Sequence, residues 1–316
     1  MFESNSTTRE WRRPCLTKSQ KQELKKLHKK NNRHGFLAIS EDIWFIASAM
    51  FLFLGIHIGF LPLSLIIIGA RQRALATLLH ETAHGILFKS PRLNRIIGKY
   101  ILAPIIFQSF LRYKKSHVYC HHPFIGDKKQ DPDYSYMLSE KAYQKANYKS
   151  VYINLVIKPL LGYKLLPYFK TIVTNRLFPL QKEANKSSYA DLIMMLFVHL
   201  LILISSFVFI DYTDKIFKAC LLWYFSLFFI HPIIGWFIEL SEHYPMMSYK
   251  TKSEIYFSRN RYAGAIETFL FSIHKENYHL THHLYPSIPF WNLKKATAIL
   301  REDADFCKWD NYWGGI

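Results

Sequence analysis

Apolar residues in this chain of 316 residues are gathered into long runs that strongly polar stretches separate. The longest run extends from Ile43 to Ala70, and only His57 and Pro62 interrupt its apolar character. A membrane-spanning helix needs about 20 mostly apolar residues, so this run is too long to be a single span. Its middle, residues 59–62, reads Gly-Phe-Leu-Pro, which is typical of a turn. The run therefore predicts a tight helical hairpin whose second arm continues into residues 71–73 and the helix beyond.

Two later apolar runs, residues 191–210 and residues 216–236, have the length and composition of further spans. The chain is therefore predicted to be an all-α integral membrane protein with four transmembrane helices in two hairpins. The predicted spans cover about residues 43–60, 62–79, 191–210 and 216–236. The remainder is predicted as a basic N-terminal segment, residues 1–41, and a single membrane domain, residues 42–316, whose helical cap comprises residues 80–190 and 237–316.

Two shorter apolar segments, Tyr100 to Leu111 and Val151 to Leu166, lie within the predicted cap. Both are too short to cross a bilayer, and both have Lys or Arg at their flanks. One interpretation is that they are helices lying in the membrane interface. The other is that they are ordinary core helices of the cap, and the sequence leaves both open.

Positive charge predicts which side of the membrane the cap faces. The formal net charge is +18, and residues 1–40 carry ten Lys and Arg against three Asp and Glu. The links on the opposite side carry almost no positive charge, so both termini and the cap are predicted to be cytosolic. Apolar runs in a basic protein indicate a membrane rather than nucleic acid, for which no zinc-finger, helix-turn-helix or RNA-binding signature is found. Lysines from Lys141 to Lys186 are expected to meet anionic lipid, or a phosphate-bearing headgroup or carrier.

The N-terminal stretch and the cysteines agree with a cytosolic face. The first forty or so residues are polar and basic, which is not typical of a cleavable signal peptide. Cys15, Cys120, Cys220 and Cys307 are scattered without the spacing of a metal site or a disulfide framework. A reducing compartment is therefore expected.

Histidine carries the candidate chemistry. Eight of the 15 histidines fall into three short clusters on the predicted cytosolic side. The clusters are His80-Glu81-Thr82-Ala83-His84, His117-Val118-Tyr119-Cys120-His121-His122 and His279-Leu280-Thr281-His282-His283. Residues three or four apart share a helix face, so His80 with His84, and His117 with His121, are each predicted to point two imidazoles at one place. His122 lies about 100° around the helix from His121, so these neighbours are predicted to reach two different metals.

The three histidines of the last cluster are predicted to converge in the same way, and imidazole suits iron, zinc and copper. A chance H-x-x-x-H is expected roughly once in such a chain, whereas each of the other two patterns is expected only about 0.03 times. The signal therefore rests on the three clusters together. The isolated histidines His28, His34, His57 and His199 are expected to be solvated or packed in the core.

Two other kinds of protein remain as alternatives. His80 to His84 also matches the H-E-x-x-H pattern of zinc proteases, in which Glu81 would be the general base. That interpretation leaves six clustered histidines without a role. A metal transporter would need polar or metal-binding residues inside several spans, whereas these clusters lie outside the predicted spans.

The string from Asn277 to Pro289, NYHLTHHLYPSIP, resembles the third histidine box of the membrane fatty-acid desaturase superfamily and the Y-P-x-I-P tail that follows it. The resemblance extends over about residues 42–305 and implies two iron ions that activate O2. The implied metal ligands are His80, His84, His117, His121, His122, His279, His282 and His283, with His243 as a ninth.

The resemblance also implies residues that support the ligands. Glu239 stands where some relatives have Asn, and is expected either to reach iron or to hold a water or a ligand imidazole. Glu81, Asn277 and His274 are further candidates of this kind. Weaker candidates are Asp131-Pro132-Asp133, which follows the second cluster, and His231, which lies inside the predicted fourth span.

The activity that the resemblance implies is O2-dependent desaturation of a fatty-acyl or similar long apolar chain, presented as a lipid or on a carrier. Hydroxylation of an acyl or alkyl substrate is the alternative, because the same box spacings occur in the alkane-hydroxylase branch. The tail after the third box favours desaturation. No cytochrome b5-like heme segment is found, so a separate electron donor such as an acidic ferredoxin is expected to dock on the basic face.

Overall fold

The computed structural model describes residues 13–177, 186–208, 213–248 and 254–315, and every regular element within these ranges is helical. Three helical runs there are long and apolar enough to cross a membrane: Arg33–Ile56, Ile58–His84 and Asp214–His243. They correspond to the predicted first, second and fourth spans. The first begins about ten residues earlier than predicted, because the preceding polar residues continue the same helix.

The predicted hairpin is confirmed. Helix α2 (Arg33–Phe51) continues through a π-helical segment, η1 (Leu52–Ile56), and ends at His57, whose backbone is extended. The Nδ1 atom of His57 accepts from the amide of Gly59 at 3.0 Å and caps the short turn η2 (Ile58–Phe60). Pro62 lies in the first turn of α3 (Leu61–His84), where a missing N–H costs nothing. α2 packs along α3, and α3 ends at Gly85 with a positive φ of 74°.

The second predicted hairpin is confirmed only in its second arm. Helix α12 (Thr213–Phe225) continues through η9 (Ser226–Ile230) into α13 (His231–His243) as one apolar run. Helix α11 (Lys186–Val208) packs beside α12. The apolar part of α11 in the described residues is Tyr189–Ile204, which is shorter than the other three runs. The last residues of the predicted third span lie outside the described residues, so the four-span arrangement stays a prediction.

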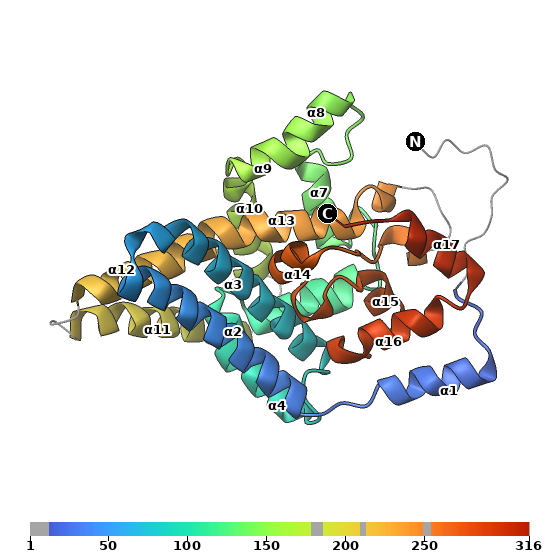
Figure 1. The fold of residues 1–316 in the computed structure, drawn as a ribbon, viewed down its shortest axis with the longest axis horizontal. Helices are drawn as coiled ribbons and strands as arrows, with labels where there is room; N and C mark the ends of the chain where they lie inside the picture. The colour runs from blue at the N-terminus through green and yellow to red at the C-terminus, as the bar shows by residue number, and fades with distance from the viewer. Residues whose placement is uncertain (1–12, 178–185, 209–212, 249–253, 316) are drawn as a thin grey trace.

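The remaining helices surround the ends of α3 and α13 (Figure 1). Before α11 they are α1 (Lys18–Leu27), α4 (Pro91–Ile97), η3 (Gly98–Leu102), α5 (Ala103–Ile105), α6 (Phe110–Lys114), η4 (Lys115–His121), α7 (Pro132–Ser139), α8 (Tyr148–Tyr152), η5 (Ile153–Ile157), α9 (Lys158–Leu160), α10 (Leu165–Thr171) and η6 (Ile172–Leu177). After α13 they are η10 (Met246–Ser248), η11 (Glu254–Phe257), α14 (Ala265–Phe271), η12 (Ile273–Lys275), α15 (His279–Leu284), α16 (Phe290–Leu300) and α17 (Ala304–Tyr312).

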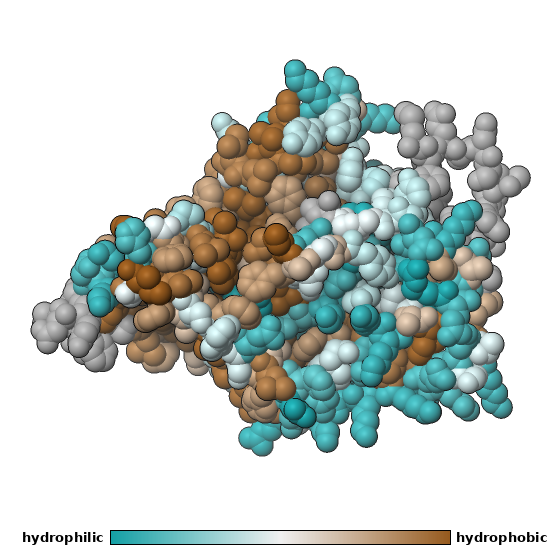
Figure 2. Space-filling view, viewed as in Figure 1, coloured by the Kyte–Doolittle hydropathy of each residue, from teal (hydrophilic) through white to brown (hydrophobic). Residues whose placement is uncertain are grey.

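The surface is divided in the way that a membrane protein requires. Figure 2 shows a hydrophobic surface over the end of the molecule formed by α2, α3, α11 and α12, and a hydrophilic surface over α1, α16 and α17. Trp44, Ile58 and Ile193 are each more than 60% exposed on the hydrophobic end. Large exposed apolar side chains of this kind are stable in lipid but not in water.

The two short apolar segments differ from each other. In Tyr100 to Leu111, Tyr100 and Ile101 are exposed, but Leu102, Ala103, Ile106 and Phe110 are buried and α5 packs against α11, so most of this segment belongs to the core. In Val151 to Leu166, by contrast, Leu161, Tyr163 and Leu166 are 65%, 69% and 80% exposed. The second segment therefore has the exposed apolar surface expected of an interfacial helix.

Candidate metal centre

Nine histidines from four segments, α3, η4, α13 and α15, converge where these segments meet. Their ring nitrogens form two groups, and within each group the ligand atoms lie within 4.8 Å of one another. The first group is His80, His84, His117, His122 and His282, and the second is His121, His243, His279 and His283. All eight histidines of the three clusters and the additional His243 are thus brought together.

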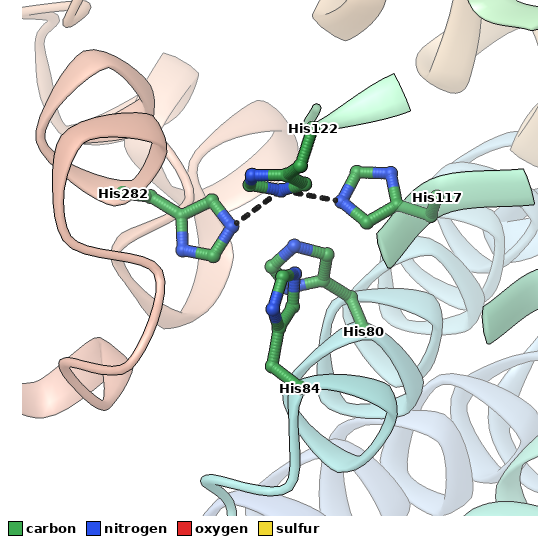
Figure 3. Close-up of side chains that lie close together, drawn as sticks. All are labelled: His80, His84, His117, His122 and His282. Carbon is green, nitrogen blue, oxygen red and sulfur yellow. Dashed lines mark hydrogen bonds between the residues drawn. The ribbon is translucent and has the colours of Figure 1, made fainter. Parts of the chain in front are cut away.

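The first group encloses one small space. His80 and His84 come from the last turn of α3, and their ring centroids are 4.6 Å apart. His122 Nε2 lies 3.1 Å from His117 Nε2 and 3.2 Å from His282 Nε2. His84 Nε2 is buried and finds no hydrogen-bond partner in the described residues. Figure 3 shows the five rings arranged around a common point, with α3 on one side and α15 on another.

The second group is more deeply buried. His279 Nε2 lies 2.9 Å from His243 Nε2 and 3.0 Å from His283 Nε2. The His121 ring completes the group, with its centroid 5.0 Å from that of His243 and 5.1 Å from that of His283. His121 and His243 are each 1% exposed.

His117 and His121 lie close together, as their spacing predicted, and their ligand atoms form a third group with Asp133. Spacing alone did not predict that His117 also joins His122 in the first group while His121 joins the second. The π-helical geometry of η4 explains this, because the amide of His122 donates to the carbonyl of His117 at 3.1 Å. A wider helix turn moves the residue at i+5, rather than i+4, onto the same face. In α15, likewise, His279 and His283 share a face while His282 points to the other group.

Burial makes most of these imidazoles neutral. Burial, reinforced by the neighbouring imidazoles, holds the pKa of His117, His279, His282 and His283 well below the ordinary value. The same causes lower the pKa of His122 to about 2. A neutral imidazole has a lone pair for a metal ion, so these rings are poised as ligands.

His121 differs because a carboxylate holds it. Burial acts to lower its pKa, but the charge and hydrogen bond of Asp131 outweigh burial and raise the pKa to about 9. Asp131 is fully buried and caps α7, accepting from the amides of Asp133 and Tyr134. His121 Nδ1 donates to Asp131 at 3.0 Å, so its Nε2 faces the second group. Asp131, a weaker candidate from the sequence, therefore contacts a grouped histidine directly.

Two glutamates hold other rings. Glu81 lies 3.6 Å from His80 Nδ1 and accepts from the amide of Phe290 at 3.0 Å, as the sequence interpretation expected. Glu242 lies 3.3 Å from His279 Nδ1, and the sequence analysis did not assign it a role. Glu242 directly precedes His243 in the sequence, and this was the feature that could have indicated its place beside the histidines.

Glu242 also forms a buried ion pair. Its carboxylate accepts from the guanidinium of Arg261 at 2.8 Å, and both side chains are almost completely buried. Arg261 donates in addition to the carbonyl of Phe271 at 3.0 Å. The pair ties the loop before α14 to the end of α13, and nothing in the sequence spacing pointed to it.

The other predicted supporting residues lie at different distances from the histidines. Glu239 Oε1 lies 4.0 Å from His243 Nε2. His274 pairs with Asp42 at 2.8 Å, and Asn277 donates to the carbonyl of Arg261 at 2.8 Å, so neither contacts a grouped histidine through these bonds. His231 is buried in α13 and lines the adjoining cavity.

A cavity of about 160 Å³ adjoins both groups. From the first group it exposes His80, His117 and His282, and from the second His121, His243 and His279. Its remaining wall comes chiefly from α3, α13, α10 and the chain around Gln108. A small molecule in this cavity would therefore touch both histidine groups.

The arrangement of nitrogens fits metal ions. His243 Nδ1 donates to the carbonyl of Phe257 at 2.9 Å, so a neutral His243 carries its lone pair on Nε2. His279 Nε2 lies 2.9 Å from that atom, close enough for both nitrogens to bind one cation. Nitrogens bound to one transition-metal ion at about 2.1 Å and at right angles are about 3.0 Å apart. The spacing matches that of neighbouring ligands on one ion.

The isolated histidines have local partners. His34 Nδ1 contacts Asn31 at 2.9 Å, and His57 caps its turn. His199 bonds to Tyr224 and to the carbonyl of Pro104, and His28 bonds to Ser287. These contacts agree with structural roles.

The described residues form helices, three of them long enough to span a membrane, and bring two groups of imidazoles together. These features are typical of helical membrane proteins with a histidine-rich metal site. Comparison with known proteins makes the class specific. The family model "Fatty acid desaturase" matches residues 56–312, and the chain belongs to the fatty acid desaturase superfamily. It is a desaturase-like oxidoreductase.

Two relatives are desaturases by name. The chain is 33% identical to dihydrorhizobitoxine desaturase of Bradyrhizobium elkanii over 289 residues, which cover 90% of this chain and 80% of the relative. It is 27% identical to sphingolipid delta(4)-desaturase of Komagataella phaffii over 256 residues, which cover 77% of this chain and 62% of the relative.

Proposed function

We propose that this protein is an O2-dependent desaturase whose nine grouped histidines hold two iron ions. The observation that supports this most is the division of the imidazoles into groups of five and four, which share one cavity. The first group would hold one iron and the second group the other. Iron bound there would supply the oxidising chemistry that removes hydrogen from an unactivated carbon.

Reduction of O2 to water takes four electrons and four protons. Two C–H bonds on neighbouring carbons would break and one C=C bond would form, which releases two protons and two electrons from the substrate. A separate electron-donor protein, such as a ferredoxin, supplies two further electrons, and two protons come from solvent. O2 is thereby reduced to two molecules of water.

The residues of the chain bind, orient and exclude water. Asp131 accepts from His121 Nδ1, which keeps the lone pair of that ring directed inward. Glu81 and Glu242 lie 3.6 Å and 3.3 Å from the Nδ1 atoms of His80 and His279, where they would favour the same orientation. Apolar side chains of Leu79, Ile106, Ile172 and Leu293 line the cavity and limit the entry of water. An aliphatic segment of an acyl or lipid-type substrate would lie against them.

Hydroxylation is the second candidate, because the same site serves it if oxygen is transferred to the carbon in place of the second hydrogen abstraction. The relatives named as desaturases favour desaturation. A zinc protease is disfavoured, because Glu81, its required general base, is buried and engaged with His80 and the amide of Phe290.

For the membrane arrangement, we infer four spans, with α11 as the third, and a cytosolic cap carrying the metal centre. The excess of Lys and Arg in residues 1–40 supports this orientation. The same basic surface would attract an acidic electron donor. Attaching a reporter to the N-terminus, and labelling from each side of the membrane, tests the orientation directly.

The function is tested by metal analysis together with product analysis. Purified protein should contain about two irons per chain, whereas one tightly held zinc without iron would exclude the proposal. Lipids and small metabolites from a host that expresses the chain should contain new double bonds only when O2 is supplied. New hydroxyl groups in place of double bonds would establish the second candidate.

A further inference from the structure

The cavity beside the histidines is unusually acidic. Five carboxylate residues line it, Glu81, Asp133, Glu239, Glu242 and Glu276, against one Lys or Arg, Arg73, among the described lining residues. Buried carboxylates are costly unless they have partners. The two irons of the proposed function would balance part of this charge, whereas the middle of a hydrocarbon chain would balance none of it.

Most of these carboxylates are already engaged. Glu81 and Glu242 hold histidines, as described above, and Asp133 lies 3.6 Å from His121 Nδ1. Glu276 pairs with Arg73 and accepts from the hydroxyl of Thr77 at 3.1 Å. These contacts leave one carboxylate to account for.

Glu239 is the exception. Its side chain is 29% exposed, but its Oε1 atom is buried, finds no hydrogen-bond partner in the described residues and lies 4.0 Å from His243 Nε2. A buried acceptor without a partner beside a cavity is a place where a donor group of a ligand can bind.

Gln108 provides an independent observation. Its side chain is 6% exposed, it lines the same cavity, and its Oε1 atom also finds no partner in the described part of the chain. Two unpartnered acceptors in one cavity can bind a ligand with more than one N–H or O–H.

Aromatic rings complete the wall. Tyr136, Tyr168 and Trp236 line the cavity together with Glu239. The ring centroid of Tyr136 lies 6.5 Å from that of Tyr168 and 6.1 Å from that of Trp236. Aromatic faces beside a carboxylate are the surroundings that favour an ammonium group, and the Nζ atom of Lys164 already lies 5.3 Å from the Trp236 ring centroid.

We propose that the substrate carries an ammonium group close to the carbons that are oxidised, and that Glu239 and Gln108 receive this group. The cavity, at about 160 Å³, is close in size to one of about 150 Å³ that holds benzene. A cavity of this size holds roughly six non-hydrogen atoms, so the ammonium group of the substrate and its reacting carbons would lie only a few bonds apart. This inference rests on the proposed function and narrows the site of oxidation on the substrate. The double bond would form near a polar end of the molecule and not in the middle of an acyl chain.

The test uses full-length, iron-loaded protein with an electron-donor system. Three probes are compared: a long-chain primary amine, a short water-soluble aliphatic amine, and the carboxylic acid that matches the long amine in length. Substrate-dependent electron consumption and product double bonds are measured for wild type, Glu239→Gln and Gln108→Leu. The control is Asp214→Asn, which removes a 74% exposed carboxylate from the same helical run. Iron per chain and the Mössbauer spectrum are recorded for each protein before a probe is added.

The expected result is turnover with an amine but not with the acid, and a KM for the amine raised about 10- to 100-fold in Glu239→Gln with unchanged iron content and spectrum. The two amines distinguish a membrane lipid base from a soluble amine as the source. A changed iron spectrum in probe-free Glu239→Gln would make Glu239 a metal ligand and overturn the inference, as would equal turnover of the acid. Two irons per chain without a new double bond from either amine would also overturn the inference, whereas wild type without two irons would instead overturn the proposed function.

Discussion

Asp131 offers a direct test of how the protein directs a ligand imidazole. Its Oδ1 atom accepts from His121 Nδ1 at 3.0 Å and from two amides that begin α7, and its Oδ2 atom accepts from the amide of Gly126 at 2.9 Å. Asp131→Asn keeps one oxygen for the helix cap, since Asn caps as well as Asp. The NH2 group of the new Asn side chain must then face either the amide of Gly126 or the amides at the start of α7. In both positions one N–H donor faces another and neither has an acceptor.

The magnitude follows from these contacts. Loss of the carboxylate partner of a ligand histidine lowers metal affinity about 10- to 100-fold, or about 1.4 to 2.7 kcal/mol. One buried N–H left without an acceptor costs a further 1 to 3 kcal/mol or so of folding stability. Iron retained by Asp131→Asn should therefore be lost at a chelator concentration at least ten times lower than for wild type.

The assay is iron per chain after equilibration with a graded series of a ferrous chelator, with thermal unfolding measured on the same samples. Asn147→Ala is the control, because it removes the N-cap of α8, where Asn147 accepts from the amide of Ser150 at 2.9 Å, away from the histidines. That control should lose about 1 kcal/mol of stability and no iron affinity. Wild-type iron affinity in Asp131→Asn would refute the reasoning.

Four further outcomes are expected. His282→Ala should abolish product and lower iron per chain while the protein remains in the membrane fraction; retained activity would remove it from the ligand set. Metal-free protein should be most stable at about pH 7 in thermal unfolding. The lowered pKa values of five imidazoles (His117, His122, His279, His282 and His283) remove stability as pH falls from there, and the raised pKa of His121 removes it as pH rises toward about 9, so a flat profile would contradict this. Arg261→Met should cost about 3–5 kcal/mol, because it leaves a buried carboxylate unpaired, and an unchanged melting temperature would show that the pair is dispensable. Gly69→Ala should destabilise by about 1–3 kcal/mol, since its Cβ would lie 2.4 Å from an isoleucine side chain of η9, whereas Gly235→Ala, which meets no atom within 4 Å, should not.

Local sequence rules predicted the parts of the site that regular helices build. His80 and His84 share a face because α3 keeps α-helical geometry to its last turn, and the hairpin turn follows from Gly59 and Pro62. The first short apolar segment could not be assigned from sequence, because an apolar helix of that length fits either a core or an interface. Only its packing against α11 decides the matter.

Other features depend on geometry that sequence spacing does not encode. The π-helical winding of η4 brings His117 beside His122 as well as beside His121, and no residue in that segment signals such winding. Glu242 and Arg261 meet only because the loop before α14 returns to the end of α13. Carboxylates that hold imidazoles are therefore found by tertiary contacts, and spacing along the chain identifies the imidazoles alone.

The division of neighbouring histidines between the two groups has a consequence for how the centre fills. His121 and His122 are joined by one peptide bond yet belong to different groups, and α15 likewise contributes His282 to one group and His283 to the other. An ion bound in either group restrains both segments, and so lowers the entropic cost of ordering the ligands of the other. Loading should consequently be cooperative, so that substoichiometric iron yields a mixture of empty and doubly loaded chains rather than a uniform population holding one ion each.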